Sequence, residues 1–116
     1  MRPERGSATV QALAVVALLT LVAFTCLQVA LAVSLRQRAA AAADLSALAA
    51  SRASVEGEEP CEVASSVAAE NGARLRACRM DADVATVTAR AEGPRWSIGR
   101  WMSDQRARAA PAWYLE

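Results

Sequence analysis

The longest feature of the hydrophobicity pattern is an uncharged run from Gly6 to Leu35, bracketed by Arg5 and Arg36. From Ala12 onward it is dominated by leucine, valine and alanine. A helix over this run would be about 45 Å long, enough to cross a ~30 Å hydrocarbon core. The rest of the chain has too little apolar surface to enclose it as a buried core helix. We therefore predict a transmembrane helix over residues 7–35, after a short basic leader over residues 1–6.

A cleaved signal peptide is the alternative interpretation of this run. Met1–Arg5 is basic, and Ala30-Leu31-Ala32 has the A-x-A form of a signal-peptidase site. Cleavage after Ala32 would release a small secreted binding module. Against it, the run is longer than the ~7–15 apolar residues of a usual signal peptide, and A-x-A triplets arise easily in an alanine-rich chain. A retained anchor is therefore the prediction that we favour.

Helical periodicity continues beyond the apolar run. Residues 36–56 are rich in alanine, and Leu45, Leu48 and Val55 fall at near-helical spacing, which predicts an extension of the same helix. The sequence Gly57-Glu58-Glu59-Pro60 then breaks it.

A second helix is predicted from Pro60 or Cys61 to about Asn71. Proline suits the first turn of a helix, and acidic residues near its start complement the helix dipole. An i, i+4 step puts Val63 and Val67 on the inward face. Asn71-Gly72 then supplies a left-handed cap.

Alternating residues next predict a β-hairpin. Its strands would be Ala73–Met80 and Val84–Ala91, joined by Asp81-Ala82-Asp83, and Gln105–Ala109 would form a third, edge strand. The predicted fold class is α+β: a long N-terminal transmembrane helix that continues into a small domain with a helix and a β-hairpin or three-stranded antiparallel sheet. We assign residues 57–110 to that domain and residues 111–116 to a flexible tail.

Four apolar residues near the end of the chain allow two interpretations. Trp96, Ile98, Trp101 and Met102 would form a small lid on the sheet. Alternatively, tryptophan flanked by arginine is typical of the headgroup region of a membrane, and this segment would then be an interfacial anchor. We favour the lid.

Composition excludes several classes of function. The chain has 13 basic and 12 acidic residues, so it lacks the basic excess of a nucleic-acid-binding protein. It has no histidine, the commonest general base and metal ligand. No GxxxxGK[ST], GxSxG, HExxH or paired CxxC motif occurs. We therefore predict no catalytic residues, no metal or other cofactor, and no small-molecule substrate; a small periplasmic enzyme is a weak alternative.

The cysteines bear on topology. Cys26 lies within the apolar run, whereas Cys61 and Cys78 lie in the polar part, 17 residues apart. An isolated pair of this kind predicts one disulfide, which requires an oxidising compartment outside the cytoplasm. Two unrelated free thiols are the alternative. If the disulfide forms, the C-terminal domain is extracytoplasmic. The disulfide would also stabilise a domain that has few large apolar side chains.

Two segments carry a family resemblance. Arg5-Gly6-Ser7-Ala8-Thr9-Val10-Gln11 resembles the prepilin-peptidase region of type IV pilin-like proteins. The run from Arg36 through Ala50 resembles the post-membrane signature of TadE/TadG-like proteins, pseudopilin-type components of Flp (tight-adherence) pilus systems. The Pro60-Cys61, Asn71-Gly72 and Cys78 pattern is similar to small actinobacterial TadE-like proteins that are encoded near secretion ATPase and helicase genes.

The resemblance implies a non-catalytic, structural role in a pilus or secretion apparatus, with other pilin-like or Tad-type proteins as partners. It implies leader cleavage after Gly6, with Ser7 as the new N-terminus. Gln11 then stands where these families carry a glutamate, which departs from a major pilin. We expect the apolar helix to pack laterally against partner helices through small residues: Ala8, Ala12, Ala23 and Ala30.

Overall fold

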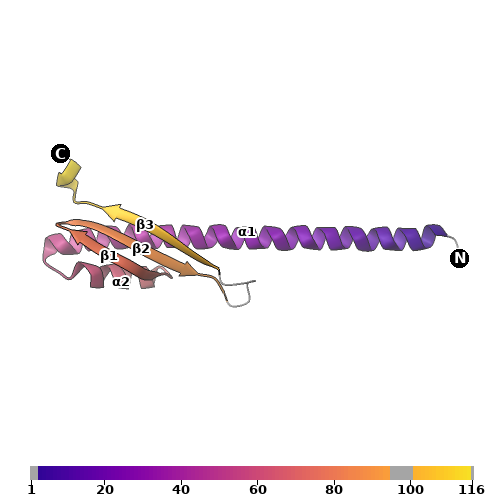
Figure 1. Ribbon diagram of the computed structural model, residues 1–116, viewed down its shortest axis with the longest axis horizontal. Coiled ribbons are helices and arrows are strands. Elements are labelled where there is room, and N and C mark those ends of the chain that lie inside the picture. The colour runs from indigo at the N-terminus through magenta and orange to yellow at the C-terminus, as the bar shows by residue number, and fades with distance from the viewer. Residues whose placement is uncertain (1–2, 95–100, 116) are drawn as a thin grey trace. The chain divides into compact units, whose positions relative to one another are not determined.

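The computed structural model describes residues 3–94 and 101–115, and the side chains of residues 6–94 and 101–113 (Figure 1). Its elements are α1 (Pro3–Glu56), α2 (Pro60–Glu70), β1 (Arg74–Asp81), β2 (Val84–Glu92), β3 (Met102–Ala109) and a 3₁₀ turn, η1 (Ala112–Leu115). This order confirms the α+β class, with a long N-terminal apolar helix followed by a three-stranded antiparallel sheet. Trp96 and Ile98 of the expected lid lie outside the described residues, as do Arg95 and Arg100.

The chain divides into two compact units, Met1–Leu31 and Ala32–Glu116. Unit 1 is the apolar part of α1, and its described side chains are exposed apart from a half-buried Gln28 and Leu31. The helix is long enough and apolar enough to cross a membrane, and its most apolar stretch has no buried residue. Transfer of its exposed leucines and valines from water to a non-aqueous environment would be favourable.

Unit 2 contains the second half of α1, α2 and the sheet. The strand order is β1-β2-β3, and both pairings are antiparallel. Both helices pack on one face of the sheet, because Ala43 and Ala47 of α1 and Ala64 of α2 share a core with Val87 of β2. The alanine-rich segment that we assigned to a separate extension therefore belongs to the same core as the sheet.

The strand β2 is central, and its side chains alternate between the face of the sheet that packs on the helices and the opposite face. Ala85, Val87, Ala89 and Ala91 are buried, and the residues between them are only half-buried. This period of two places every second side chain against the helices, as the alternation in the sequence predicted. The third strand was predicted as Gln105–Ala109; it begins three residues earlier, at Met102, and lies at the edge of the sheet.

The strand β1 contains a bulge that the sequence did not reveal. Leu75 pairs with Ala89 and Ala77 pairs with Thr88, so Arg76 is an extra residue between two consecutive partners on β2. Without a bulge, residues 75 and 78 would face opposite sides of the sheet. The inserted residue lets both Leu75 and Cys78 pack against the core.

The inward face of α2 differs from our expectation. The buried residues are Ala64 and Ala68, whereas Val63 and Val67 are only half-buried. The helix ends as predicted at a left-handed glycine, since Gly72 has a φ of +71°. Its amide donates to Ala69 O and that of Ala73 to Ala68 O, at 3.1 and 2.9 Å, which completes a Schellman cap.

Candidate functional site

The second half of α1 has mostly small side chains on its inner face and larger apolar side chains on its outer face. Its buried residues are Leu35, Ala39, Ala42, Ala43, Ser46, Ala47, Ala50, Ser51 and Ala53. The larger side chains of Leu45, Leu48 and Val55 face outward and are 45%, 58% and 48% exposed. Alanine on the inner face allows the sheet to approach the helix closely, and the leucines remain free for a contact outside the chain.

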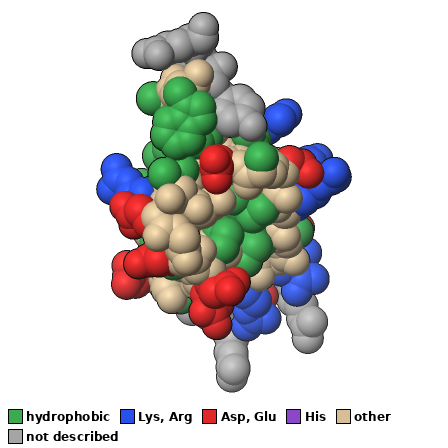
Figure 2. Space-filling model, turned by 90° about the vertical axis from the view of Figure 1, so that its left-hand side faces the viewer, with side chains coloured by type: hydrophobic (Ala, Val, Ile, Leu, Met, Phe, Trp, Pro, Cys, Tyr) green, Lys and Arg blue, Asp and Glu red, His purple; other side chains and the backbone are tan. Residues whose placement is uncertain are grey.

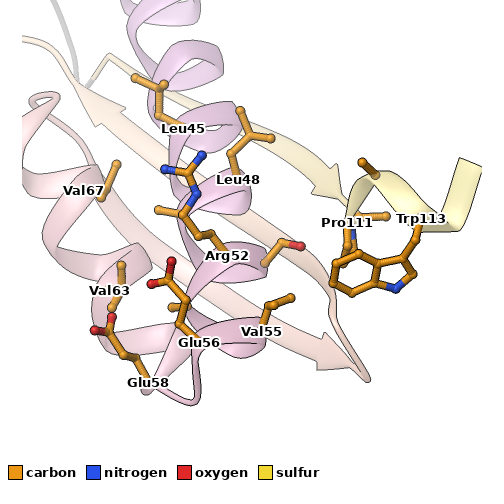
Figure 3. Close-up of a pocket in the computed structure, with 15 residues that line it drawn as sticks. Leu45, Leu48, Arg52, Val55, Glu56, Glu58, Val63, Val67, Pro111 and Trp113 are labelled. Carbon is orange, nitrogen blue, oxygen red and sulfur yellow. The ribbon is translucent and has the colours of Figure 1, made fainter.

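These outward residues form the floor of a groove, which we call the apolar trough. It has a volume of about 650 Å³ and is lined by residues from three parts of unit 2. Leu45, Leu48 and Val55 come from α1, Val63 and Val67 from α2, and Pro111 and Trp113 from the C-terminal segment. In Figure 3, the valines of α2 lie on one side of the α1 side chains, and Pro111 and Trp113 lie on the other.

The trough is suited to binding apolar side chains, because most of its lining residues are apolar. Its described polar lining residues are Ser51, Arg52, Glu56 and Glu58. The part of the chain that the structure describes contains no group of three or more residues able to hold a metal ion. Figure 2 views unit 2 from the end where α1 meets α2, and apolar side chains are visible there between charged ones.

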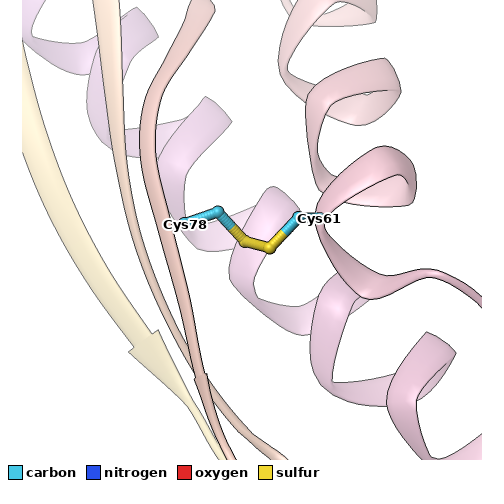
Figure 4. Close-up of a disulfide and its surroundings, with 2 residues drawn as sticks. All are labelled: Cys61 and Cys78. Atoms are coloured by element: carbon cyan, nitrogen blue, oxygen red, sulfur yellow. A yellow bond between two sulfur atoms is a disulfide. The ribbon is translucent and has the colours of Figure 1, made fainter.

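A disulfide fixes the α2 wall of the trough. Cys61, in the first turn of α2, is bonded to Cys78 of β1, with 5.9 Å between their Cα atoms (Figure 4). Val63 and Val67 follow Cys61 on the same helix, which the bond ties to β1. Cys26 is a free, exposed thiol in unit 1.

Two hydroxyl groups fasten the β1–β2 turn to α1 near the trough. Ser51 Oγ donates to the backbone oxygen of Asp83 at 2.7 Å, and Ser54 Oγ donates to Asp83 Oδ1 at 2.8 Å. Ala82, the other turn residue, has a φ of +53°, which is strained for a residue with a Cβ. Asp83 is therefore a structural residue of the turn, and Asp81 forms an exposed ion pair with Arg79 at 3.3 Å.

The best-aligned ion pair lies on the outer face of the sheet, away from the trough. Arg90 Nε and Nη2 donate to the two carboxylate oxygens of Asp104 at 2.6 and 2.9 Å, which joins β2 to β3. This hydrogen bonding, and then the charge of Arg90 and Arg76, lower the pKa of Asp104, although desolvation opposes the shift. The same hydrogen bond raises the pKa of Arg90.

The residues of the expected processing and packing sites all lie on α1 within unit 1. Gly6, Ser7 and Gln11 are exposed and already helical, because α1 begins at Pro3. The small residues Ala8, Ala12, Ala23 and Ala30 are also exposed. Their roles in cleavage and helix packing remain predictions.

The trough itself was not predicted from the sequence. Leu45, Leu48 and Val55 were identified by their spacing, but spacing alone does not show which face is inward. The available signal for the outward face was side-chain size, since the positions between Leu45 and Val55 other than Leu48 are almost all alanine or serine.

Comparison with known proteins adds one match. No curated protein and no solved structure is significantly similar to the chain. Residues 6–55, somewhat less than half of the chain, match the family model described as "Putative Flp pilus-assembly TadE/G-like". The matched segment covers the apolar run and the α1 floor of the trough, so this part of α1 is similar to the TadE/G-like pilus-assembly family.

Proposed function

We propose that the chain is a single-pass membrane protein that serves as a minor pseudopilin or accessory component of a Flp-type pilus or secretion apparatus. The observation that carries the proposal is that the segment similar to TadE/G-like proteins exposes its large apolar side chains along both units. An α-helix with this property is stable only when lipid or other helices cover it. Our narrower proposal is a relationship to the small actinobacterial TadE-like proteins.

The role is structural in this proposal, and the apolar trough receives an apolar helix of another assembly component. Two heptad positions support a helical partner. Leu13, Leu27, Leu48 and Val55 share one of them with Thr20, Ser34 and Ala41, so this position carries no charge. Val10, Phe24 and Leu45 share the other with Ala17, Leu31 and two arginines, Arg38 and Arg52. The seven large apolar residues other than Leu31 are exposed. Such a 3-4 spacing is the seam along which two helices pack side by side.

The proposed orientation places unit 2 outside the cytoplasm. The Cys61–Cys78 bond supports it, because a disulfide persists in an oxidising compartment. The charges beside the apolar run do not decide the matter, since arginines lie on both sides of it.

A second candidate is a secreted module released after Ala32. The observation in its favour is that the second compact unit begins at Ala32, so cleavage there would leave its strands and α2 intact. The intact mass of the mature protein from its host separates the candidates. Loss of residues 1–6 supports a processed pseudopilin, loss of residues 1–32 supports the secreted module, and a full-length mass supports an unprocessed anchor.

Co-purification from host membranes tests the assembly role. We expect the tagged full-length chain to retain pilin-like or Tad-type proteins that mass spectrometry identifies. Leu45→Glu/Leu48→Glu should reduce their recovery at least about tenfold, because burying a carboxylate in an apolar contact is costly. Ser65→Glu/Ser66→Glu is the matched control, since both residues are exposed on α2 and neither lines the trough. Unchanged recovery with the trough variant, or no such proteins with the wild type, would overturn the proposal.

A further inference from the structure

One end of unit 2 lies directly after the apolar run, and we call it the proximal end. Leu35 is the last apolar residue of the run, and Arg36 is the first charged residue after it. A Cβ placed on Gly93 would lie 3.2 Å from Leu35 Cδ1 and 2.9 Å from Trp101 Cβ. The amide of Gly93 also donates to Trp101 O at 2.7 Å. Gly93, at the end of β2, and Trp101, directly before β3, therefore lie beside the point where the apolar run stops.

The same end gathers arginines that are distant in the sequence. Arg36 and Arg38 are exposed on α1. A Cβ on Gly72 would lie 3.2 Å from Arg38 Cδ, so the turn between α2 and β1 lies against this arginine. Arg74, two residues later, is exposed at the start of β1. The fold thus places Arg74 at the same end of unit 2 as Arg36 and Arg38.

These three guanidinium groups have no acidic partner among the residues whose side chains the structure describes. In residues 6–94 and 101–113, no ion pair involves Arg36, Arg38 or Arg74. Arg74 stands in register with Arg90, but Arg90 is paired with Asp104. The other acidic residues of this end are Glu70 and Glu92, and neither forms an ion pair with these arginines.

Acidic residues gather instead at the opposite end of unit 2, where α1 meets α2: Glu56, Glu58, Glu59 and Glu62. Unit 2 thus has a cluster of four glutamates at this far end, whereas the end next to the apolar run has Arg36, Arg38 and Arg74 beside Glu70 and Glu92. The proximal end also exposes Met102 and has the half-buried Trp101 beside it, and amphipathic or apolar side chains of this kind suit a membrane interface.

We propose that the proximal end of unit 2 is a lipid-binding surface, in which Arg36, Arg38 and Arg74 bind the phosphates of anionic phospholipids. Three observations favour lipid as the occupant: the continuity with the apolar run, the unpaired positive charge, and the apolar residues beside it. A guanidinium group binds phosphate through paired N–H donors, and each basic residue near an anionic surface strengthens attraction roughly fivefold. The surface would hold the base of unit 2 on the bilayer, independently of any assembly partner.

Lipid retention by the purified full-length protein tests this inference. The protein in mild detergent is titrated with phosphatidylglycerol or phosphatidylcholine, and bound lipids are counted by native mass spectrometry. We expect the wild type to retain phosphatidylglycerol in preference. Arg36→Gln/Arg38→Gln/Arg74→Gln should weaken that binding by more than about tenfold, and raised ionic strength should weaken it in the wild type.

The matched control removes the same charge elsewhere. Arg52→Gln/Arg106→Gln/Arg108→Gln changes three exposed arginines outside the proximal end, and it should retain phosphatidylglycerol. An unreduced mass with the Cys61–Cys78 bond intact, together with the wild-type circular dichroism spectrum, shows that each variant is folded. Equal retention of the two lipids, equal loss in both variants, or full retention by the proximal variant would overturn the inference. Because no assembly protein is present, these outcomes are separate from the fate of the proposed function.

Discussion

On the second half of α1 the small apolar residues are buried and the large ones are exposed. Ala47 is fully buried against the sheet, while its neighbour Leu48 is 58% exposed. In most domains burial favours the larger side chain, because it removes more apolar surface from water. On this inner face small side chains are favoured, and among the described residues of unit 2 no buried hydrophobic side chain is larger than Leu35.

A pair of neighbouring substitutions tests this arrangement. Ala47→Leu should destabilise unit 2 by about 1–3 kcal/mol, because the added carbons have no space between α1 and the sheet. Leu48→Ala should change stability by less than about 0.5 kcal/mol, as is usual at an exposed position. Urea unfolding of the full-length protein in detergent, followed by near-ultraviolet circular dichroism, measures both. The reverse order of effects would show that the inner face is assigned wrongly.

Asp104 gives unit 2 a pH dependence. The hydrogen bonds from Arg90 lower its pKa below the ordinary value of 3.8 in the folded state. A carboxylate with a lowered folded pKa stabilises the fold above its unfolded pKa, and that contribution is lost as pH falls through the folded pKa.

Asp104→Asn should therefore unfold at a slightly lower temperature than the wild type at neutral pH, and the two should converge as the pH falls below the lowered pKa of Asp104. Because the pair is exposed, the difference should be small and should shrink with added salt. Thermal unfolding across this pH range is the measurement, and a constant difference at every pH would contradict the cause that we assign.

At the scale of elements, the disulfide is the main connection between α2 and the sheet apart from packing against small side chains. The loop that it closes spans 17 residues and contains the whole of α2 after Cys61. A domain with so few large buried side chains depends more than most on such a constraint.

Removing the bond should destabilise unit 2 by about 3 kcal/mol in the chain-entropy description. Cys61→Ser/Cys78→Ser and reduction of the wild type should lower the urea midpoint by similar amounts. Cys26→Ser is the control, because this thiol is free and lies in unit 1. An unchanged midpoint after reduction would show that packing alone holds α2 in place.

Element boundaries were largely predictable because they depend on local chemistry. Gly57 and Pro60 end and begin helices through backbone restrictions that act within a few residues. In the same way, Gly72 precedes the first strand of the hairpin and the Asp81-Ala82-Asp83 turn joins its two strands. The bulge at Arg76 was not predictable, since no local preference marks it; the requirement that both Leu75 and Cys78 reach the core creates it.

For the whole molecule, the sequence predicted the apolar helix and the small α+β unit. It did not predict which helix faces are buried and which are exposed. Spacing identified Leu45, Leu48, Val63 and Val67 as members of helix faces. Which face of a helix is inward depends on the element that packs against it, here the sheet. In an alanine-rich helix the alanine face can approach the sheet more closely than the face with leucine and valine. The trough and the proximal end both depend on this tertiary choice, as they join residues from separate elements.

The bulge in β1 also affects how the chain tolerates a change in length. Arg76 has no partner of its own on β2, so a chain that lacked it would keep Leu75 and Cys78 facing the core and would keep every other pairing. Deletion of Arg79 would instead turn Met80 away from the core. This strand thus has one site where losing a residue preserves the register of the sheet, beside others where the same loss would disrupt it.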